Sequence, residues 1–381
     1  MQRESVSAHP GAGGEGAAPV RLLAASTLAE AVAHSIRAEG GWWPFDRFMH
    51  AALYTPGQGY YASGERVFGA LPSDGSDFIT APELSPLFGH CLARQVAQGL
   101  DATGCGEVWE FGAGSGALAE QLLETLGSAV RRYTIVDLSS AMRQRQRQRL
   151  ARFADQVVWA DTLPVEFSGV LLGNEVLDAM PVRLLHFDGQ HWQERGVALE
   201  DDGQLAWADR ATASVPPHEG PFLPGTVVEI HEQAEAFVRS LAERLSKGLM
   251  LFIDYGFPQA EFYHPQRSQG TLMCHQGHRA DANPLSDVGR KDITAHINFT
   301  GIALAAQDAG ADVLGYTSQA RFLLNCGLME QAQEAHWRTR ANAQKLITEH
   351  EMGELFKVLA LGRNISIDPV GFVAGDRMHR L

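Results

Sequence analysis

The chain has 381 residues, of which 45% are hydrophobic, so it can bury one large core or two smaller ones. Its formal net charge of -14 argues against nucleic acid as a partner, because binding to phosphates needs clustered Lys and Arg that outweigh nearby carboxylates. No apolar run approaches the length of a membrane span, and we expect a soluble protein without membrane insertion.

The four cysteines, Cys91, Cys105, Cys274 and Cys326, are scattered and contain no CxxC pair. This pattern favours free thiols in a reducing compartment, and we expect a cytoplasmic protein. Residues 1–20 are rich in small residues and lack an apolar central stretch. They therefore predict a disordered leader and not a secretion signal. The sequence does not indicate an oligomeric state.

Residues 21–104 predict a mostly helical N-terminal extension. Apolar residues recur at helical spacing over 24–38 and stop at a glycine pair, and a short second helix is ended by Pro56. A third helix follows Ser85 and Pro86. Between the second and third helices, "GSDFITAPE" is long and polar, as either a functional loop or a plain surface connection would be.

From residue 105 to the end, short apolar strands alternate with helices, which predicts an α/β fold with a mostly parallel sheet covered on both faces. We expect strands at 107–111, 132–138, 156–160, 169–175 and 249–256. A helix, a strand and a helix after residue 300, and a last strand at 356–363, would complete this core.

Polar side chains recur at the carboxyl ends of the predicted strands. They are Glu110, Asp137, Asp161, Asn174, Glu175, Asp254 and Tyr255. Any one of them could simply cap the helix that follows. Ligands of open α/β sheets bind beyond the strand ends, so the set as a whole indicates a bound adenosine.

The glycines in "EFGAGSGALAEQLL" fit two kinds of cofactor loop. Gly112, Gly114 and Gly116 match the GxGxG of methyltransferases, and with Ala117 the loop also matches the dinucleotide pattern GxGxxG/A. Asp137, at the next strand end, would accept hydrogen bonds from the ribose of either ligand. Glu110 separates them, because its carboxylate would repel a pyrophosphate and attract a sulfonium. We therefore expect S-adenosylmethionine, with an NAD(P)-dependent oxidoreductase as the rival.

The stretch "NEVLDAMPV" brings carboxylates to the methyl donor. Glu175 and Asp178 would share one side if the turn between them is helical, and two carboxylates there suggest a cationic acceptor. Arginine fits, because its guanidinium is a poor nucleophile until carboxylates fix its plane. We assign that role to Glu175. Asp178 could instead hold the loop before Pro181.

Three other segments remain. Two Asp-Gly turns predict an inserted β-meander at 183–212 on a sheet edge, and the polar, His- and Gly-rich segment 257–299 predicts a substrate lid. A metal site could be formed by Cys274, His275, His278 and Asp281. Their spacing fits no common zinc motif, however, and we expect no metal. Five arginines between 143 and 152 predict a solvated helix face.

Taken together, "FMHAALYTPGQGYY", "GSDFITAPELSPLFG", "EFGAGSGALAEQLL", "NEVLDAMPV", "DYG" and "GRKDITAHINF" resemble the MidA-type class I methyltransferases, which include a mitochondrial complex I assembly factor. The resemblance spans nearly the whole folded chain. It implies a Rossmann-like, seven-stranded core, S-adenosylmethionine as donor, and an arginine of a protein partner as acceptor. A scaffold that binds the donor with little turnover is the alternative. Ala113, Asp137 and Asn298 stand where the family usually has proline, glutamate and aspartate.

The resulting site has three groups of residues. We expect catalytic roles for Glu175, Asp178 and His296. We expect the cofactor to be bound by Thr80, Pro82, Glu110, Gly112, Gly114, Gly116, Asp137, Leu138, Asp161, Thr162, Asn174 and Glu175. We expect the substrate to contact Asp254, Tyr255 and Asp292.

Overall fold

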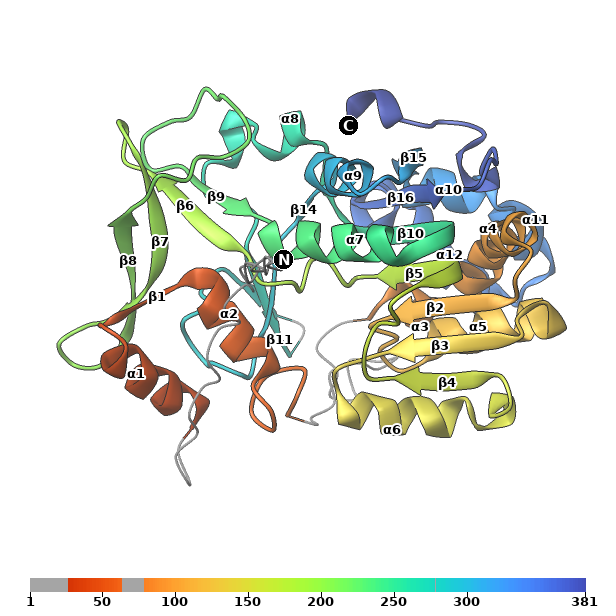
Figure 1. Cartoon of the computed structure of the whole chain (residues 1–381), viewed down its shortest axis with the longest axis horizontal. Coiled ribbons are helices and arrows are strands. Elements are labelled where there is room, and N and C mark those ends of the chain that lie inside the picture. Colours follow the sequence, from red (N-terminus) through yellow and green to blue (C-terminus); the bar gives the residue numbers. More distant parts are fainter. Residues whose placement is uncertain (1–26, 64–78, 278) are drawn as a thin grey trace, which may run out of the picture.

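The computed structural model of the chain describes residues 27–63, 79–277 and 279–381. Its centre is a sheet with the strand order β15-β16-β10-β5-β2-β3-β4, and a short β14 beside β10 (Figure 1). The strands are β2 (Glu107–Phe111), β3 (Arg132–Val136), β4 (Val157–Ala160), β5 (Phe167–Asn174), β10 (Leu245–Phe257), β14 (Ile297–Asn298), β15 (Asp312–Ser318) and β16 (Phe356–Arg363). The predicted α/β fold is confirmed, and seven of the eight strands form one continuous order, with β14 as the addition.

The strands of this sheet run mostly parallel. The pairs β10-β5, β5-β2, β2-β3 and β3-β4 are parallel, and β16 runs antiparallel to both β10 and β15. All five expected core strands and the expected last strand are present. Their near-continuous apolar sequences follow from burial on both faces; in β10, for example, Leu249 to Ile253 are all buried.

Helices cover both faces of the central sheet. On one face, α4 (Leu87–Thr103), α5 (Ala117–Leu126), α10 (Gln319–Asn325) and α12 (Trp337–Ile347) share a core with the strands, and α11 (Leu328–Glu334) joins α10 to α12. On the other face, α7 (Glu232–Arg244) and α9 (Phe299–Asp308) form a second core. Helix α6 (Ser140–Arg149) connects β3 to β4 at one end of the sheet (Figure 1).

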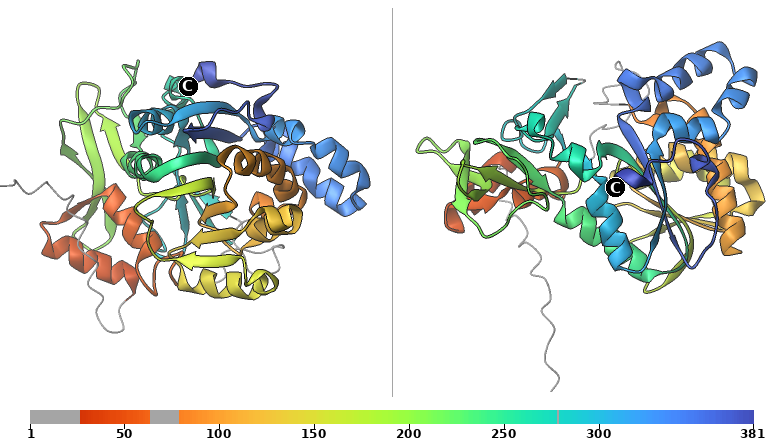
Figure 2. Two further views of the ribbon diagram at one scale, coloured as in Figure 1. Left: turned by 45° about the vertical axis from the view of Figure 1, so that its right-hand side comes forward. Right: turned by 90° about the horizontal axis from the view of Figure 1, so that it is seen from above.

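A second, antiparallel sheet stands apart from the first, as the view from above shows (Figure 2). It contains β1 (Trp42–Pro44), β6 (Arg183–Phe187), β7 (Trp192–Leu199), β8 (Leu205–Ala211) and β9 (Val227–Ile230). The predicted antiparallel β6-β7-β8 meander exists, and β8, which pairs only with β7, is an edge strand. The meander belongs to a sheet of its own, because β1 pairs with β7 and β9 pairs with β6.

The N-terminal residues supply elements to both parts of the molecule. Helices α1 (Leu28–Ala38) and α2 (Phe45–Tyr54) pack against the second sheet, whereas α3 (Ala81–Leu84) and α4 pack with α5 on the central sheet. The predicted leader over 1–20 lies outside the described residues. In the parts of the chain that are described, no helix combines the length and the apolar composition needed to cross a membrane.

The segment predicted as a lid forms a third, three-stranded sheet with the order β12-β11-β13. Its strands are β11 (Met273–Gln276), β12 (Arg279–Asp281) and β13 (Asp292–Thr294), and α8 (Gln259–Phe262) precedes them. Asn298, where the resemblance leads one to expect aspartate, caps α9 by accepting a hydrogen bond from the Gly301 amide at 3.4 Å. Asn298 is buried, so the change removes no carboxylate from an open surface.

Candidate functional site

A cavity of about 1170 Å³ lies where the carboxyl ends of β2, β3, β5 and β10 meet the three-stranded sheet. Its wall carries eight acidic side chains and, among the described residues, no Lys or Arg. These acids are Glu83, Glu110, Asp137, Asp161, Glu175, Asp178, Asp292 and Glu351. Two of these acids, Asp161 and Glu83, already pair with arginines that lie outside the wall. The other six favour cationic ligands, because carboxylates this close repel one another until a cation binds.

The glycine loop brings bare backbone to the cavity wall. Gly112 has a φ of 60°, and a Cβ atom there would lie 3.0 Å from Cγ2 of Val176. Gly114 has a φ of 51° and also lines the cavity. Gly116, with a φ of 85°, lies behind the wall and caps α5. The N-terminus of α5 thus lies behind the loop, as the glycine pattern predicts.

Asp137 is held from two sides. Its Oδ1 accepts a hydrogen bond from the Ser139 amide at 2.9 Å, and its Oδ2 accepts one from Nε2 of Gln146 at 2.7 Å. Burial raises the pKa of Asp137, and these two hydrogen bonds oppose that rise. A carboxylate fixed in this way fits the recognition of vicinal hydroxyls, such as those of a ribose.

Gln146 is a positioning residue that sequence reasoning missed. Its Nε2 also donates to the carbonyl of Gly114 at 2.9 Å, and its Oε1 accepts from Nε1 of Trp159 at 2.9 Å. It therefore ties the glycine loop to Asp137. The helix has an exposed face, as its arginines predict, but Gln146 lies fully buried between Met142 and Leu150 on the other face. That four-residue spacing of apolar neighbours was the available signal.

Glu110 is 2% exposed at the end of β2, and its Oε2 accepts a hydrogen bond from the Tyr133 hydroxyl at 2.8 Å. Burial raises the pKa of Glu110 to about 8, against the effect of Tyr133 and together with that of nearby Asp137. The carboxyl is therefore mostly protonated at neutral pH until a cation reaches it. This fits a ligand that carries positive charge.

The segment after β5 is a tight turn and not the helical turn proposed from the sequence. Glu175 has a φ of 53°, which is a strained conformation for a residue with a side chain. Asp254 holds the turn from below: its Oδ2 accepts from the amides of Leu177 and Asp178 at 3.0 and 3.2 Å. Asp254 is not on the cavity wall, and its position supports the turn and not a substrate.

The carboxyls of Glu175 and Asp178, both in this turn, nevertheless line the cavity. Burial raises the pKa of Glu175 to about 8, with a further contribution from Asp178, and burial raises the pKa of Asp178 to about 6. Oδ2 of Asp178 accepts a hydrogen bond from the Tyr255 hydroxyl. Two buried acceptors of this wall, Oδ1 of Asn174 and Oδ1 of Asp178, have no partner within the described part of the chain. They suit a ligand rich in hydrogen-bond donors.

The opposite wall comes from the lid segment and the N-terminal helices. Oδ1 of Asp292 accepts a hydrogen bond from the Tyr61 hydroxyl at 2.8 Å, and the Tyr61 ring stacks on Tyr54 at 5.7 Å. Burial lowers the pKa of His296 to about 4, with smaller contributions from Arg267 and Lys357, so this imidazole is neutral at pH 7. Tyr54 and Tyr61 were not predicted, although "GQGYY" placed Tyr61 in a recognised motif.

Five further predicted residues also lie on the cavity wall. They are Thr80, Pro82, Leu138, Asp161 and Thr162. The side chain of Leu138 is 85% exposed, and an apolar ring such as adenine would cover it and remove that apolar surface from water. Asp161 forms an ion pair with Arg143. Of the predicted loop "GSDFITAPE", residues 75–78 lie outside the described residues.

The metal site considered from the sequence receives no support. In the ranges that the structure describes, no three His, Cys, Asp or Glu side chains gather to hold an ion. His278 lies outside those ranges. The thiol of Cys274 is buried, and burial raises its pKa to about 12, so it is not a ready ligand.

Residues 91–317 match a family model described as "putative S-adenosyl-L-methionine-dependent methyltransferase". A solved structure from Burkholderia thailandensis, described as a "likely methyl transferase" bound to S-adenosyl-homocysteine, is 49% identical and has a TM-score of 0.90. That alignment covers 93% of this chain and 96% of the other. A native structure from the same organism is 47% identical, covers 93% and 96%, and has a TM-score of 0.86.

Curated relatives are more distant. A Caenorhabditis elegans protein named "Protein arginine methyltransferase NDUFAF7 homolog, mitochondrial" is 25% identical over 82% of this chain and 81% of its own length. The human protein named "Protein arginine methyltransferase NDUFAF7, mitochondrial" is 26% identical over 82% of this chain and 78% of its own length. These names contradict the expected cytoplasmic location. The expected location rested on the four cysteines, which are free, and free thiols do not distinguish one compartment from another.

The comparisons also remove the ambiguity of the glycine loop. Its pattern alone fits a dinucleotide as well as a methyl donor, whereas the acidic cavity and the relative with bound S-adenosyl-homocysteine agree on the donor. The chain therefore belongs to the S-adenosyl-L-methionine-dependent methyltransferases, with that molecule as its cofactor.

Proposed function

We propose that the methyl acceptor is an arginine side chain of a protein partner. The observation that carries this proposal is the cavity wall, with its eight acidic side chains and no described Lys or Arg. A cavity that served the donor alone would need few of them. Relatives that are named protein arginine methyltransferases point to the same acceptor.

The donor and the acceptor would use different parts of the wall. For the donor, we propose Asp137 at the ribose, Leu138 at the adenine, and Gly112 and Gly114 at the methionine part, near Glu110. When bound, S-adenosylmethionine supplies an electrophilic methyl group. The remaining wall, from Glu175 and Asp178 across to Asp292, is then left for the acceptor.

Glu175 and Asp178 can prepare a guanidinium for methylation. Arginine stays protonated at neutral pH, so its nitrogen must be fixed and relieved of a proton when it gains the methyl group. Asp178 offers the unpartnered Oδ1, which accepts an N-H donor without breaking an existing hydrogen bond. Glu175, with its raised pKa, is a stronger base than an ordinary carboxylate once cationic ligands ionise it.

Neighbouring groups keep these carboxyls in place. Asp254 fixes the turn through two amides, and Tyr255 donates to Asp178. His296, whose pKa is lowered to about 4, adds no positive charge to the acceptor wall at neutral pH. Because these contacts hold the carboxyls before ligands arrive, we expect alignment of the reacting groups to supply most of the rate acceleration.

The test is transfer of labelled methyl groups from the donor into the proteins of a cell extract, followed by hydrolysis and identification of the labelled amino acid. We expect methylarginine, and at least about a hundredfold loss of transfer in Glu175→Gln. That variant should still bind S-adenosylhomocysteine. Glu200→Gln, on the exposed turn after β7, is the matched control. Labelled lysine or a labelled small molecule would contradict the arginine assignment.

A further inference from the structure

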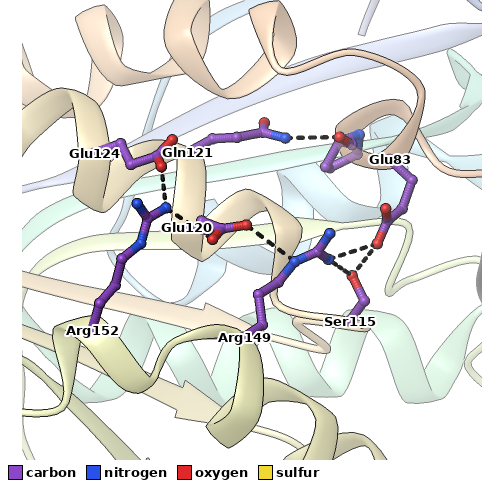
Figure 3. A network of polar contacts seen from close by, with 8 residues as sticks. Glu83, Ser115, Glu120, Gln121, Glu124, Arg149 and Arg152 are labelled. Atoms are coloured by element: carbon purple, nitrogen blue, oxygen red, sulfur yellow. Dashed lines mark hydrogen bonds and ion pairs between the residues drawn. The ribbon is translucent and has the colours of Figure 1, made fainter. Parts of the chain in front are cut away.

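A polar network at the edge of the cavity joins the glycine loop to α3. Arg149, at the end of α6, bonds Oε1 of Glu83 at 2.8 Å and also donates to the Ser115 hydroxyl. Ser115 in turn donates to Glu83 (Figure 3). Glu83 and Ser115 both line the cavity. One guanidinium thus connects two separate segments of the cavity wall.

The same guanidinium is anchored to α5. Its Nε lies 3.1 Å from Oε2 of Glu120, which also pairs with Arg152 (Figure 3). A planar guanidinium can bond several acceptors at once in a fixed geometry, which a lysine cannot do. The side chains of Arg149 and Glu83 are 31% and 11% exposed, so this contact is better shielded from water than an ordinary surface ion pair.

Helix α3 depends on such contacts. It has four residues, too few for a stable helix by itself. Gln121 of α5 donates to the carbonyl of Pro82 in α3 at 2.8 Å and accepts from the Gly89 amide in α4 at 3.0 Å, so it links α3 to both neighbouring helices. The backbone of Ala81 also opposes the rise in the pKa of the Glu175 carboxyl, so α3 lies near that side chain. The position of α3 therefore affects both the donor loop and the acceptor wall.

We propose that Arg149 is a positioning residue that seats α3 against the glycine loop before the methyl donor binds. Without this contact, α3 and the loop occupy other arrangements, and the apparent affinity for the donor falls with the seated fraction. The proposal rests on the donor alone and stands whether or not the acceptor is arginine.

The chain offers a matched control. Arg152 in the short helix Ala151–Phe153 bonds Glu120 and Glu124 on α5, and among the described residues it forms no hydrogen bond or ion pair with α3 or the glycine loop. Arg149→Met and Arg152→Met remove the same charge from the same network. They differ in whether the lost contact reaches α3.

The experiment measures the dissociation constant of S-adenosylhomocysteine by calorimetry, and the hydrogen exchange of segments 79–85 and 112–116 without ligand. We expect Arg149→Met to bind roughly tenfold more weakly and to lose protection in both segments, with protection restored by saturating ligand. Arg152→Met should bind within about twofold of the parent protein, because surface ion pairs contribute little. Arg149→Lys should recover part of the affinity.

Two results would overturn the proposal. One is unchanged affinity and unchanged protection in Arg149→Met. The other is an equal loss in Arg152→Met, which would mean that the network only stabilises the fold. If Arg149→Met fails to fold, Glu83→Met removes the same contact from the α3 side, and unchanged protection there would count equally against the proposal.

Discussion

Glu110 should release a proton when the methyl donor binds. The group is 2% exposed and its pKa is raised to about 8 in the ligand-free protein, so about nine-tenths of it is protonated at pH 7. A nearby sulfonium or ammonium favours the charged form. Full ionisation on binding therefore releases about 0.9 proton from this group, and the logarithm of the association constant rises by about 0.9 per pH unit near pH 7.

Calorimetry in buffers of different ionisation enthalpy measures this release directly. Glu110→Gln should lower the number of protons released on binding at pH 7 by about 0.9. Glu175→Gln should lower that number by a similar amount if the donor also ionises the Glu175 carboxyl. Tyr133→Phe removes the 2.8 Å hydrogen bond that favours the charged form and should bring the release close to one proton. Proton release that is the same in Glu110→Gln and the parent protein would refute the reasoning.

Two further predictions follow from the backbone and the buried carboxyls. Gly112→Ala and Gly127→Ala should each lose about 1 kcal/mol of stability, because both glycines have positive φ, of 60° and 51°. Only Gly112→Ala should also lose affinity for S-adenosylhomocysteine, since its new Cβ meets Val176 at 3.0 Å on the cavity wall, whereas no atom lies within 4 Å at Gly127; equal loss in both would contradict this. The melting temperature of the ligand-free protein should fall between pH 6 and 8.5. The folded chain holds the Glu110 and Glu175 protons more tightly than the unfolded chain, so this stabilisation is complete below the ordinary pKa of 4.5 and is lost as pH rises through about 8. A melting temperature that rises over this range would show that these carboxyls are not buried as described.

Much of the central sheet was predictable, because its strands are buried on both faces and therefore consist of nearly continuous apolar residues. The polar residues at the strand ends were also predictable. Glu110, Asp137 and Glu175 each interrupt an apolar run, and a hydrophobic core has no need of a charged side chain there. The loop before α5 was predictable from the glycines at 112, 114 and 116, because glycine adopts positive φ most easily.

Long-range contacts were not predictable from local pattern. The sequence alone determined which residues form strands and which carry charge at their ends. Only the tertiary structure decided that Asp254 supports the turn of Glu175, that the meander pairs with β1 and β9, and that Tyr61 reaches Asp292 across 231 positions of sequence. From the sequence, Gln146 and Arg149 would be expected to face solvent. In the structure Gln146 is buried and Arg149 contacts Glu83 of α3, because of how α6 packs. Periodicity reports how a residue relates to its neighbours in the chain, whereas hydrogen-bond partners depend on how distant segments meet in space.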